Sequence, residues 1–122
     1  MTIYGLDHVQ LAMPPGCEDQ ARAFFGGVLG MTEEAKPEPL ASRGGCWFRQ
    51  GAAILHLGVE ADFRAQKKAH PAFLVGDLDE LGKKLGEVKW DDALPDRRRF
   101  YASDPFGNRL EFVQRGDGFS EK

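Results

Sequence analysis

The sequence contains few cysteines, no long apolar segment and no strong excess of charge of either sign. Its 122 residues include 16 basic and 19 acidic side chains, a net charge of −3 at pH 7. Such a balance does not favour nucleic acid, so no nucleic-acid partner is expected. The two cysteines, Cys17 and Cys46, are too few for a disulfide framework and lack the spacing of a metal-binding pair. Reduced thiols in a cytoplasmic protein are therefore the default expectation.

Segments that direct a protein to a membrane are also missing. Residues 1–4 contain neither a basic n-region nor an apolar h-region, and no run approaches the ~18 apolar residues needed to cross a bilayer. We therefore expect no membrane partner. With 42% hydrophobic and 29% charged residues, the composition is typical of a soluble globular protein, and 122 residues form one domain with a core.

The pattern near the C-terminus predicts a hairpin whose second strand carries an inward carboxylate. Pro105 and Gly107 favour a turn, and the residues that follow alternate in polarity. Leu110 and Phe112 share one face of this predicted strand, whereas Glu111 lies on the other among apolar neighbours. A lone glutamate of this kind is usually exposed to solvent, so its interpretation depends on the three histidines of the chain.

Residues 4–60 predict a strand, a helix and three further strands. The helix begins near Glu18, ends at Gly30 and carries an apolar stripe of Ala21, Phe24, Phe25 and Val28. The four strands are expected at 6–12, as an edge strand within 32–45, at 46–50 and at 53–59. His8 and His56 each lie opposite the large apolar side chains of their strands.

The same order of elements recurs in residues 70–115, after a polar linker at 61–69. Asp77 and Glu80 form a capping-box pattern that begins a helix, which ends before Gly86. The four strands of this half are expected at 70–75, at 88–90, at 97–102 and after Asn108. Internal duplication explains the repetition, and a polar tail is expected at 116–122.

A pseudo-two-fold relation between the halves would bring His8, His56, His70 and Glu111 together. Each lies opposite the face that its strand turns toward large apolar neighbours. Imidazole and carboxylate groups are ligands of borderline divalent metals, so the pattern predicts a site for Zn, Ni, Mn or Fe(II). The spacing is not that of a compact motif, and the prediction therefore depends on the fold.

With these motifs the chain resembles the vicinal oxygen chelate superfamily, which includes glyoxalase I, fosfomycin-resistance thiol transferases, extradiol dioxygenases and bleomycin-resistance binding proteins. The resemblance is carried by the segments 6–9, 24–30, 70–75 and 104–111. It implies an α+β fold in which two βαβββ modules form a curved mixed sheet around a cavity. It also implies a metal held by His8, His70 and Glu111.

The resemblance implies a glyoxalase-like metalloenzyme of the lyase or isomerase type, which chelates a small oxygenated substrate and transfers a proton. Glu111 and His56 are the candidate catalytic residues. His56 stands where glyoxalase I usually has a carboxylate, and it could be a fourth ligand or an acid–base group. Two alternatives remain open: a ring-cleaving extradiol-type dioxygenase and a metal-free, bleomycin-resistance-like binding protein.

Three residues are candidates for substrate contact. Gln10 shares a strand face with His8, Trp47 could stack on a ligand, and Tyr101 matches a substrate-side tyrosine of the fosfomycin enzymes. A set of basic residues is expected to be mostly solvated, but one or two of them near the cavity opening would favour an anionic ligand; the set is Arg43, Arg64, Lys67, Lys68 and the run Arg97 to Arg99. A homodimer is expected because each module leaves sheet edges unpaired.

Overall fold

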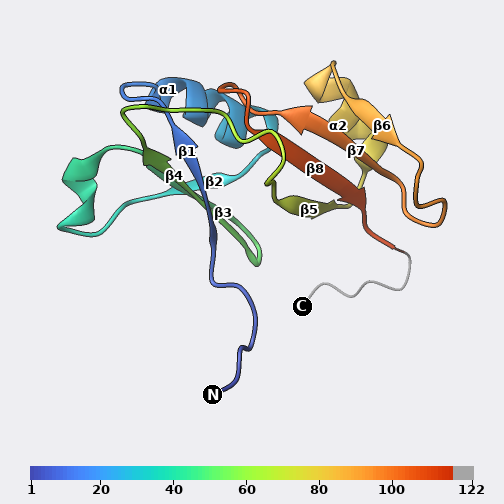
Figure 1. Cartoon of the computed structure of the whole chain (residues 1–122), viewed down its shortest axis with the longest axis horizontal. Helices are drawn as coiled ribbons and strands as arrows, with labels where there is room; N and C mark the ends of the chain where they lie inside the picture. Colours follow the sequence, from blue (N-terminus) through green and yellow to red (C-terminus); the bar gives the residue numbers. More distant parts are fainter. Residues whose placement is uncertain (117–122) are drawn as a thin grey trace. The chain divides into compact units, whose positions relative to one another are not determined.

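A computed structural model describes residues 1–116, which fall into a first unit, Met1–Ala65, and a second unit that begins at Gln66. The first unit contains a four-stranded sheet in the order β1-β4-β3-β2 (Figure 1). Its strands are β1 Val9–Met13, β2 Thr32–Glu34, β3 Cys46–Gln50 and β4 Ala53–Val59. β1 runs parallel to β4, and the other neighbours are antiparallel. The tail expected at 116–122 lies outside the described residues, apart from Gly116.

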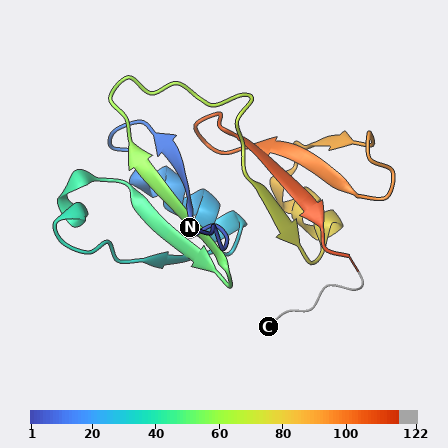
Figure 2. The same cartoon turned by 60° about the horizontal axis from the view of Figure 1, so that its bottom comes forward.

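The second unit repeats this sheet, with the order β5-β8-β7-β6 (Figure 2). Its strands are β5 Ala72–Val75, β6 Lys89–Asp91, β7 Arg99–Ser103 and β8 Arg109–Gln114. β5 is parallel to β8, and the remaining neighbours are antiparallel. Each unit therefore has the βαβββ order that the sequence predicts, and the α+β fold class is confirmed.

The helix of the first unit is less regular than its sequence predicts. It begins as α1 Glu18–Ala21 and continues as the wider-turned η1 Arg22–Val28, in which the Leu29 amide donates to the Phe24 carbonyl at 2.9 Å. This widening interrupts the regular α-helical stripe, so Ala21 and Phe25 are fully buried while Phe24 is only half-buried. The weak helix formers Gly26 and Gly27 lie in the widened stretch.

The helix of the second unit follows its prediction closely. It is α2 Leu78–Leu85, and the Asp77 carboxylate caps it by accepting a hydrogen bond from the Glu80 amide at 3.0 Å. Leu78 and Leu81 are buried on its inner face. Gly86, at φ 79°, ends the helix as expected.

The predicted C-terminal hairpin is confirmed, and its turn has a structural role. The Oδ1 atom of buried Asp104 accepts hydrogen bonds from the amides of Phe106 and Asn108, each at 2.9 Å. Asn108 Oδ1 in turn accepts from the Gln66 amide at 3.1 Å. Gly107 adopts a positive φ of 89° in this turn. These polar side chains close the hairpin and hold the beginning of the second unit against it.

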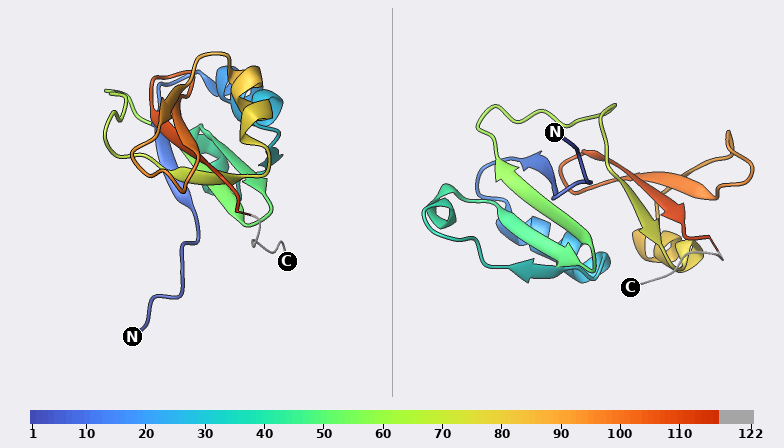
Figure 3. Two further views of the ribbon diagram at one scale, coloured as in Figure 1. Left: turned by 90° about the vertical axis from the view of Figure 1, so that its right-hand side faces the viewer. Right: turned by 90° about the horizontal axis from the view of Figure 1, so that it is seen from below.

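The first strand begins later than the sequence predicts. Hydrogen bonding starts at Val9, so residues 1–7 and His8 precede the sheet, and this segment extends away from the first unit (Figure 3). Its apolar side chains are exposed, with Ile3 at 86% and Tyr4 at 96%. The described chain, residues 1–116, also contains no helix long and apolar enough to cross a membrane.

Candidate metal and substrate-binding site

His56 and Glu111 occupy equivalent positions in the two sheets. The first-unit row of neighbours across β1, β4, β3 and β2 is Gln10, His56, Trp47 and Glu34. The second-unit row across β5, β8, β7 and β6 is Ala72, Glu111, Tyr101 and Lys89. His8 and His70 each lie two residues before the first member of their row. The duplication thus places the four candidate ligands at matching positions, two in each unit.

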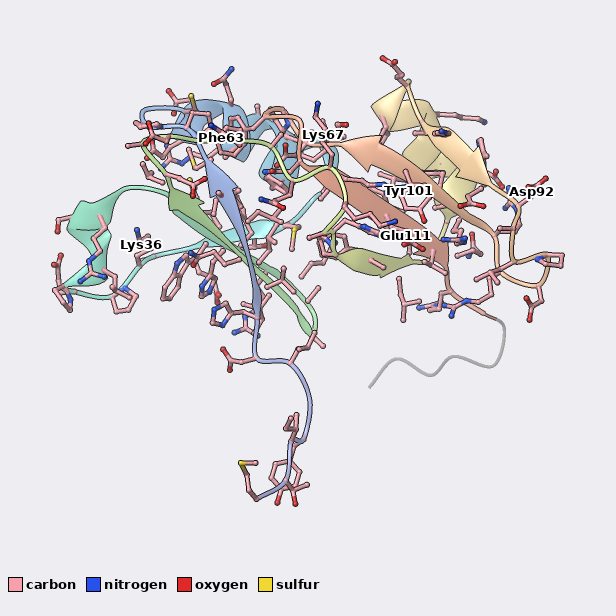
Figure 4. All side chains as sticks on the ribbon, in the orientation of Figure 1. Lys36, Phe63, Lys67, Asp92, Tyr101 and Glu111 are labelled. Atoms are coloured by element: carbon pink, nitrogen blue, oxygen red, sulfur yellow. The ribbon has the colours of Figure 1, made fainter. Side chains whose placement is uncertain are left out.

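In the second unit, Glu111 lies at the centre of a network of charged side chains. Its Oε1 atom is 2.9 Å from His70 Nε2, and its Oε2 atom accepts a hydrogen bond from Arg99 Nη1 at 3.1 Å. The same Nη1 atom donates to the Tyr101 hydroxyl at 2.8 Å, and Arg99 Nη2 is paired with Asp91 Oδ2 at 3.1 Å. Figure 4 shows Tyr101 and Glu111 on neighbouring strands of this sheet.

This network keeps Glu111 ionised. Burial raises the pKa of its carboxyl group, but hydrogen bonds from His70 and Arg99 outweigh burial, and the pKa lies below its ordinary value. The hydrogen bond to Glu111 likewise raises the pKa of Arg99. Glu111 therefore provides a negatively charged oxygen, Oε1, that faces an imidazole nitrogen.

The geometry around His70 fits a cation between His70 and Glu111. His70 Nδ1 lies 2.7 Å from the carbonyl oxygen of Lys68, which can only accept a proton. In a neutral imidazole this leaves Nε2 unprotonated, so its lone pair faces the Glu111 carboxylate at 2.9 Å. A proton or a metal ion must balance these facing lone pairs. A ring nitrogen anchored on a carbonyl while the other binds the ion is a common arrangement of metal-binding histidines.

In the first unit, His56 is held between two other rings. Its ring centroid lies 4.1 Å from that of His8, with an interplanar angle of 21°, and 3.9 Å from that of Trp47, at 1°. Burial lowers the pKa of His56, and repulsion from His8 lowers it further, so the imidazole is neutral at pH 7. His8 Nδ1 is 2.8 Å from Asp7 Oδ2, which leaves its Nε2 atom available to a ligand.

A cavity of about 160 Å³ lies beside this stack in the first unit. Its lining residues come from the sheet and from the segment that contains the short helix η2 Leu40–Arg43; they are Gln10, Lys36, Leu40, Arg43, Trp47, Leu57 and Gly58. Two of the three predicted substrate-contact residues, Gln10 and Trp47, therefore line a cavity. The third, Tyr101, lies in the second unit beside Arg99 and Glu111.

Neither unit gathers three metal-binding side chains by itself within residues 1–116. The second unit pairs His70 with Glu111, and the first unit stacks His8 on His56. The sequence also grouped Arg99 with a solvated basic run. In the structure its side chain is only 12% exposed and is paired with Glu111. Arg99 lies two residues before Tyr101 along the strand, and this spacing was the signal that could have placed both side chains on one face of the sheet.

Comparisons with known proteins agree with this fold. A Bacillus anthracis protein described only as a member of the glyoxalase family is 52% identical, with a TM-score of 0.90 over 95% of this chain and 98% of that chain. Lactoylglutathione lyase from Agrobacterium tumefaciens is 22% identical, with a TM-score of 0.64 over 91% and 96%.

A mutant of the fosfomycin resistance protein of Listeria monocytogenes, complexed with Mn(II) and 1S,2S-dihydroxypropylphosphonic acid, is 17% identical, with a TM-score of 0.73 over 91% of this chain and 90% of that chain. No protein-family model and no curated protein matches the sequence. The likeness to the lyase and the resistance protein shows the fold alone, whereas 52% identity over nearly the whole chain shows the family. The chain belongs to the glyoxalase family, within the vicinal oxygen chelate superfamily.

Proposed function

We propose that this protein is a divalent-metal-dependent enzyme of the glyoxalase type, a lyase or isomerase that acts on a small oxygenated substrate. The observation that carries the proposal is the pair of His70 Nε2 and Glu111 Oε1, 2.9 Å apart, with the other ring nitrogen anchored on a carbonyl. The related fosfomycin resistance protein holds Mn(II), which supports a divalent cation here.

The proposed ligands are His8, His70 and Glu111. Their donor atoms suit Zn, Ni, Mn or Fe(II), and each histidine has the partner on its other nitrogen that orients a metal ligand. A bound ion would act as a Lewis acid on two adjacent oxygens of the substrate.

His56 is proposed as an acid–base group and not as a fourth ligand. A metal ion lies close to the plane of each imidazole that binds it, about 2.1 Å from the nitrogen. The planes of His8 and His56, stacked at 4.1 Å and inclined by 21°, do not meet that close to their nitrogens. Because the neutral His56 ring can accept a proton, it can take one from the substrate, as can Glu111 Oε1.

Elemental analysis tests this proposal. Protein purified without chelator or affinity tag should contain about one Zn, Ni, Mn or Fe ion per chain, and the His8→Ala/Glu111→Ala double variant should contain none. His56→Ala is the matched control: it should retain the ion. Loss of proton exchange between substrate and D2O in this variant, followed by NMR, would assign the proton transfer to His56, whereas retained exchange would assign it to Glu111. An absence of ion after incubation with each metal would contradict the proposal.

The same protein preparation distinguishes two other possible functions from the proposed one. Fe(II) content with oxygen consumption would support an extradiol-type dioxygenase. Ligand affinity in a protein that takes up none of these metals would support a metal-free binding protein, which Trp47 at the cavity favours. Against that alternative, about 160 Å³ is smaller than the ~300–1,000 Å³ of pockets that enclose a drug-sized ligand.

We also propose that the chain forms a homodimer. Apolar side chains are exposed before β1, at Ile3, Tyr4 and Leu6, and in the second unit at Leu74 and Trp90. Surface of this kind is typical of association sites. Sedimentation equilibrium should give the mass of two chains, and a mass of one chain across the micromolar range would contradict the proposal.

A further inference from the structure

We infer that the cavity of the first unit binds an anionic oxygen group, a carboxylate or a phosphonate, at one end of a small ligand. The inference is drawn from the first unit alone and requires no metal. Only its link to catalysis, in which this group is the second point of attachment of a substrate chelated near His8, rests on the proposed function.

The cavity exists where the first unit lacks a side chain that the second unit has. Gly58 lines it, two residues after His56; the equivalent residue, two after Glu111, is Val113. A Cβ atom at Gly58 would lie 2.7 Å from Gln10 Nε2, so the Gln10 amide occupies part of the space above this glycine. The hollow thus contains the side-chain amide of Gln10, a hydrogen-bond donor, next to the backbone of Gly58.

Two cationic side chains, Lys36 and Arg43, line the cavity, and they differ in what already balances their charge. The Lys36 ammonium donates to the Gly44 carbonyl, whereas Arg43 has no hydrogen bond or ion pair within residues 1–116 (Lys36 is labelled in Figure 4). None of the described lining residues is acidic.

The carboxylates of β2, the strand that precedes Lys36 in the chain, are already paired. Glu33 Oε1 accepts from Arg22 Nε at 2.9 Å, and Glu34 Oε2 accepts from Arg49 Nε at 3.1 Å. Lys36 has the Gly44 carbonyl and the charge of Glu18 beside it, so Arg43 is the cation that remains for a ligand, and an anionic oxygen group is the chemistry that satisfies it.

The size and walls of the cavity define the rest of the ligand. A volume of about 160 Å³ corresponds to roughly five water molecules, enough for one anionic group on a short stem. Leu40 and Leu57 provide apolar wall, and the Trp47 ring offers a surface for a flat stem. Trp47 also contacts His56, which contacts His8, so the Trp47 ring lies two ring spacings from the proposed metal ligand His8.

Calorimetric titration of the full chain, freed of metal and then of chelator, tests the inference. The probes are benzoate, phenylphosphonate and the uncharged isostere benzamide. Benzoate or phenylphosphonate should bind, and the stronger of the two identifies the preferred group. Benzamide should bind at least about tenfold more weakly, because a charge-assisted hydrogen bond contributes a factor of roughly 10 to 100.

Three variants locate the binding. Gly58→Val introduces the residue that the second unit has at the equivalent position, and its side chain should fill the hollow and abolish binding. The fold should tolerate the change, because the atoms nearest the new Cβ belong to the flexible Gln10 side chain. Arg43→Gln should weaken benzoate roughly 10- to 100-fold without affecting benzamide. Lys83→Gln, the same charge change at an exposed residue of α2 in the second unit, should have no effect.

Equal affinity for benzoate and benzamide would overturn the inference, as would unchanged binding in Gly58→Val when circular dichroism shows it folded. If Gly58→Val fails to fold, Gly58→Ala replaces it and should weaken benzoate measurably. Because no metal is present, failure here leaves the metal proposal standing, and absence of metal leaves this inference standing.

Discussion

The two units share one backbone plan but stabilise their central rows in different ways. In the first unit, His56 is stacked between the rings of His8 and Trp47. In the second unit, Glu111 at the equivalent position is tied to His70 and Arg99 by hydrogen bonds and charge. Equivalent backbone positions therefore support either a neutral ring stack or an ionic network, depending on a few side chains.

One position explains much of this difference. Arg99 lies two residues before Tyr101, and the equivalent residue, two before Trp47, is Gly45. Gly45 adopts a φ of +84°, and a Cβ atom there would lie 2.1 Å from the Leu57 carbonyl oxygen. The first unit has no room for a side chain where the second unit places the arginine that orients its carboxylate.

Gly45→Ala should therefore have the largest effect on stability. The left-handed backbone costs about 1–2 kcal/mol for an L-residue, and displacing a backbone carbonyl adds a similar amount, so we expect a loss of ~3 kcal/mol. Gly51→Ala is the matched control: its φ is +58° with nothing within 4 Å, so only the backbone cost should appear. Urea denaturation measures both, and equal losses would show that the close approach to Leu57 is unimportant.

Arg99→Ala should have the next largest effect. It leaves Glu111 and Asp91 without their cation, and the Glu111 side chain is only 12% exposed. Arg49→Ala removes an arginine from an exposed pair with Glu34, in which the side chains are 46% and 38% exposed. Removing one partner of a buried ion pair lowers the free energy of unfolding at least about threefold more than removing one partner of an exposed pair. Similar urea midpoints for the two variants would contradict the central role of Arg99.

The smallest expected effect is a difference between the two units in how their stability depends on pH, measured on metal-free protein. The pKa of His56 is lower in the folded chain than in the unfolded chain. As pH falls below about 6.5, the imidazole is protonated in the unfolded chain before it is protonated in the folded chain, so the folded state loses stability. The pKa of Glu111 is also lowered, and its contribution is lost only as pH falls below about 4.3.

Hydrogen exchange, corrected for intrinsic rates, distinguishes these two windows. Between pH 6.5 and pH 5, amides of β4 should lose protection relative to those of β8. His56→Gln should remove this difference. If β4 loses protection equally in the variant, another group is responsible for the pH dependence.

The sequence alone was sufficient to predict the order of elements, because each periodic pattern depends on local geometry. Alternation placed His56 and Glu111 on the faces opposite the apolar side chains, and the repeated order identified their equivalence. The capped helix α2 was predicted almost to its bounds for the same reason, since Asp77 and Gly86 act on their immediate neighbours.

Contacts between distant residues were decided only by the tertiary structure. A period of two residues identifies a face but not a partner, so it could not pair Arg99 with Glu111 or place His56 between two rings. The widened turn of η1 and the cavity beside Gly58 likewise depend on how segments far apart in the chain pack together. Side-chain chemistry was thus readable from the sequence, whereas the partners of those side chains required the register of the sheets.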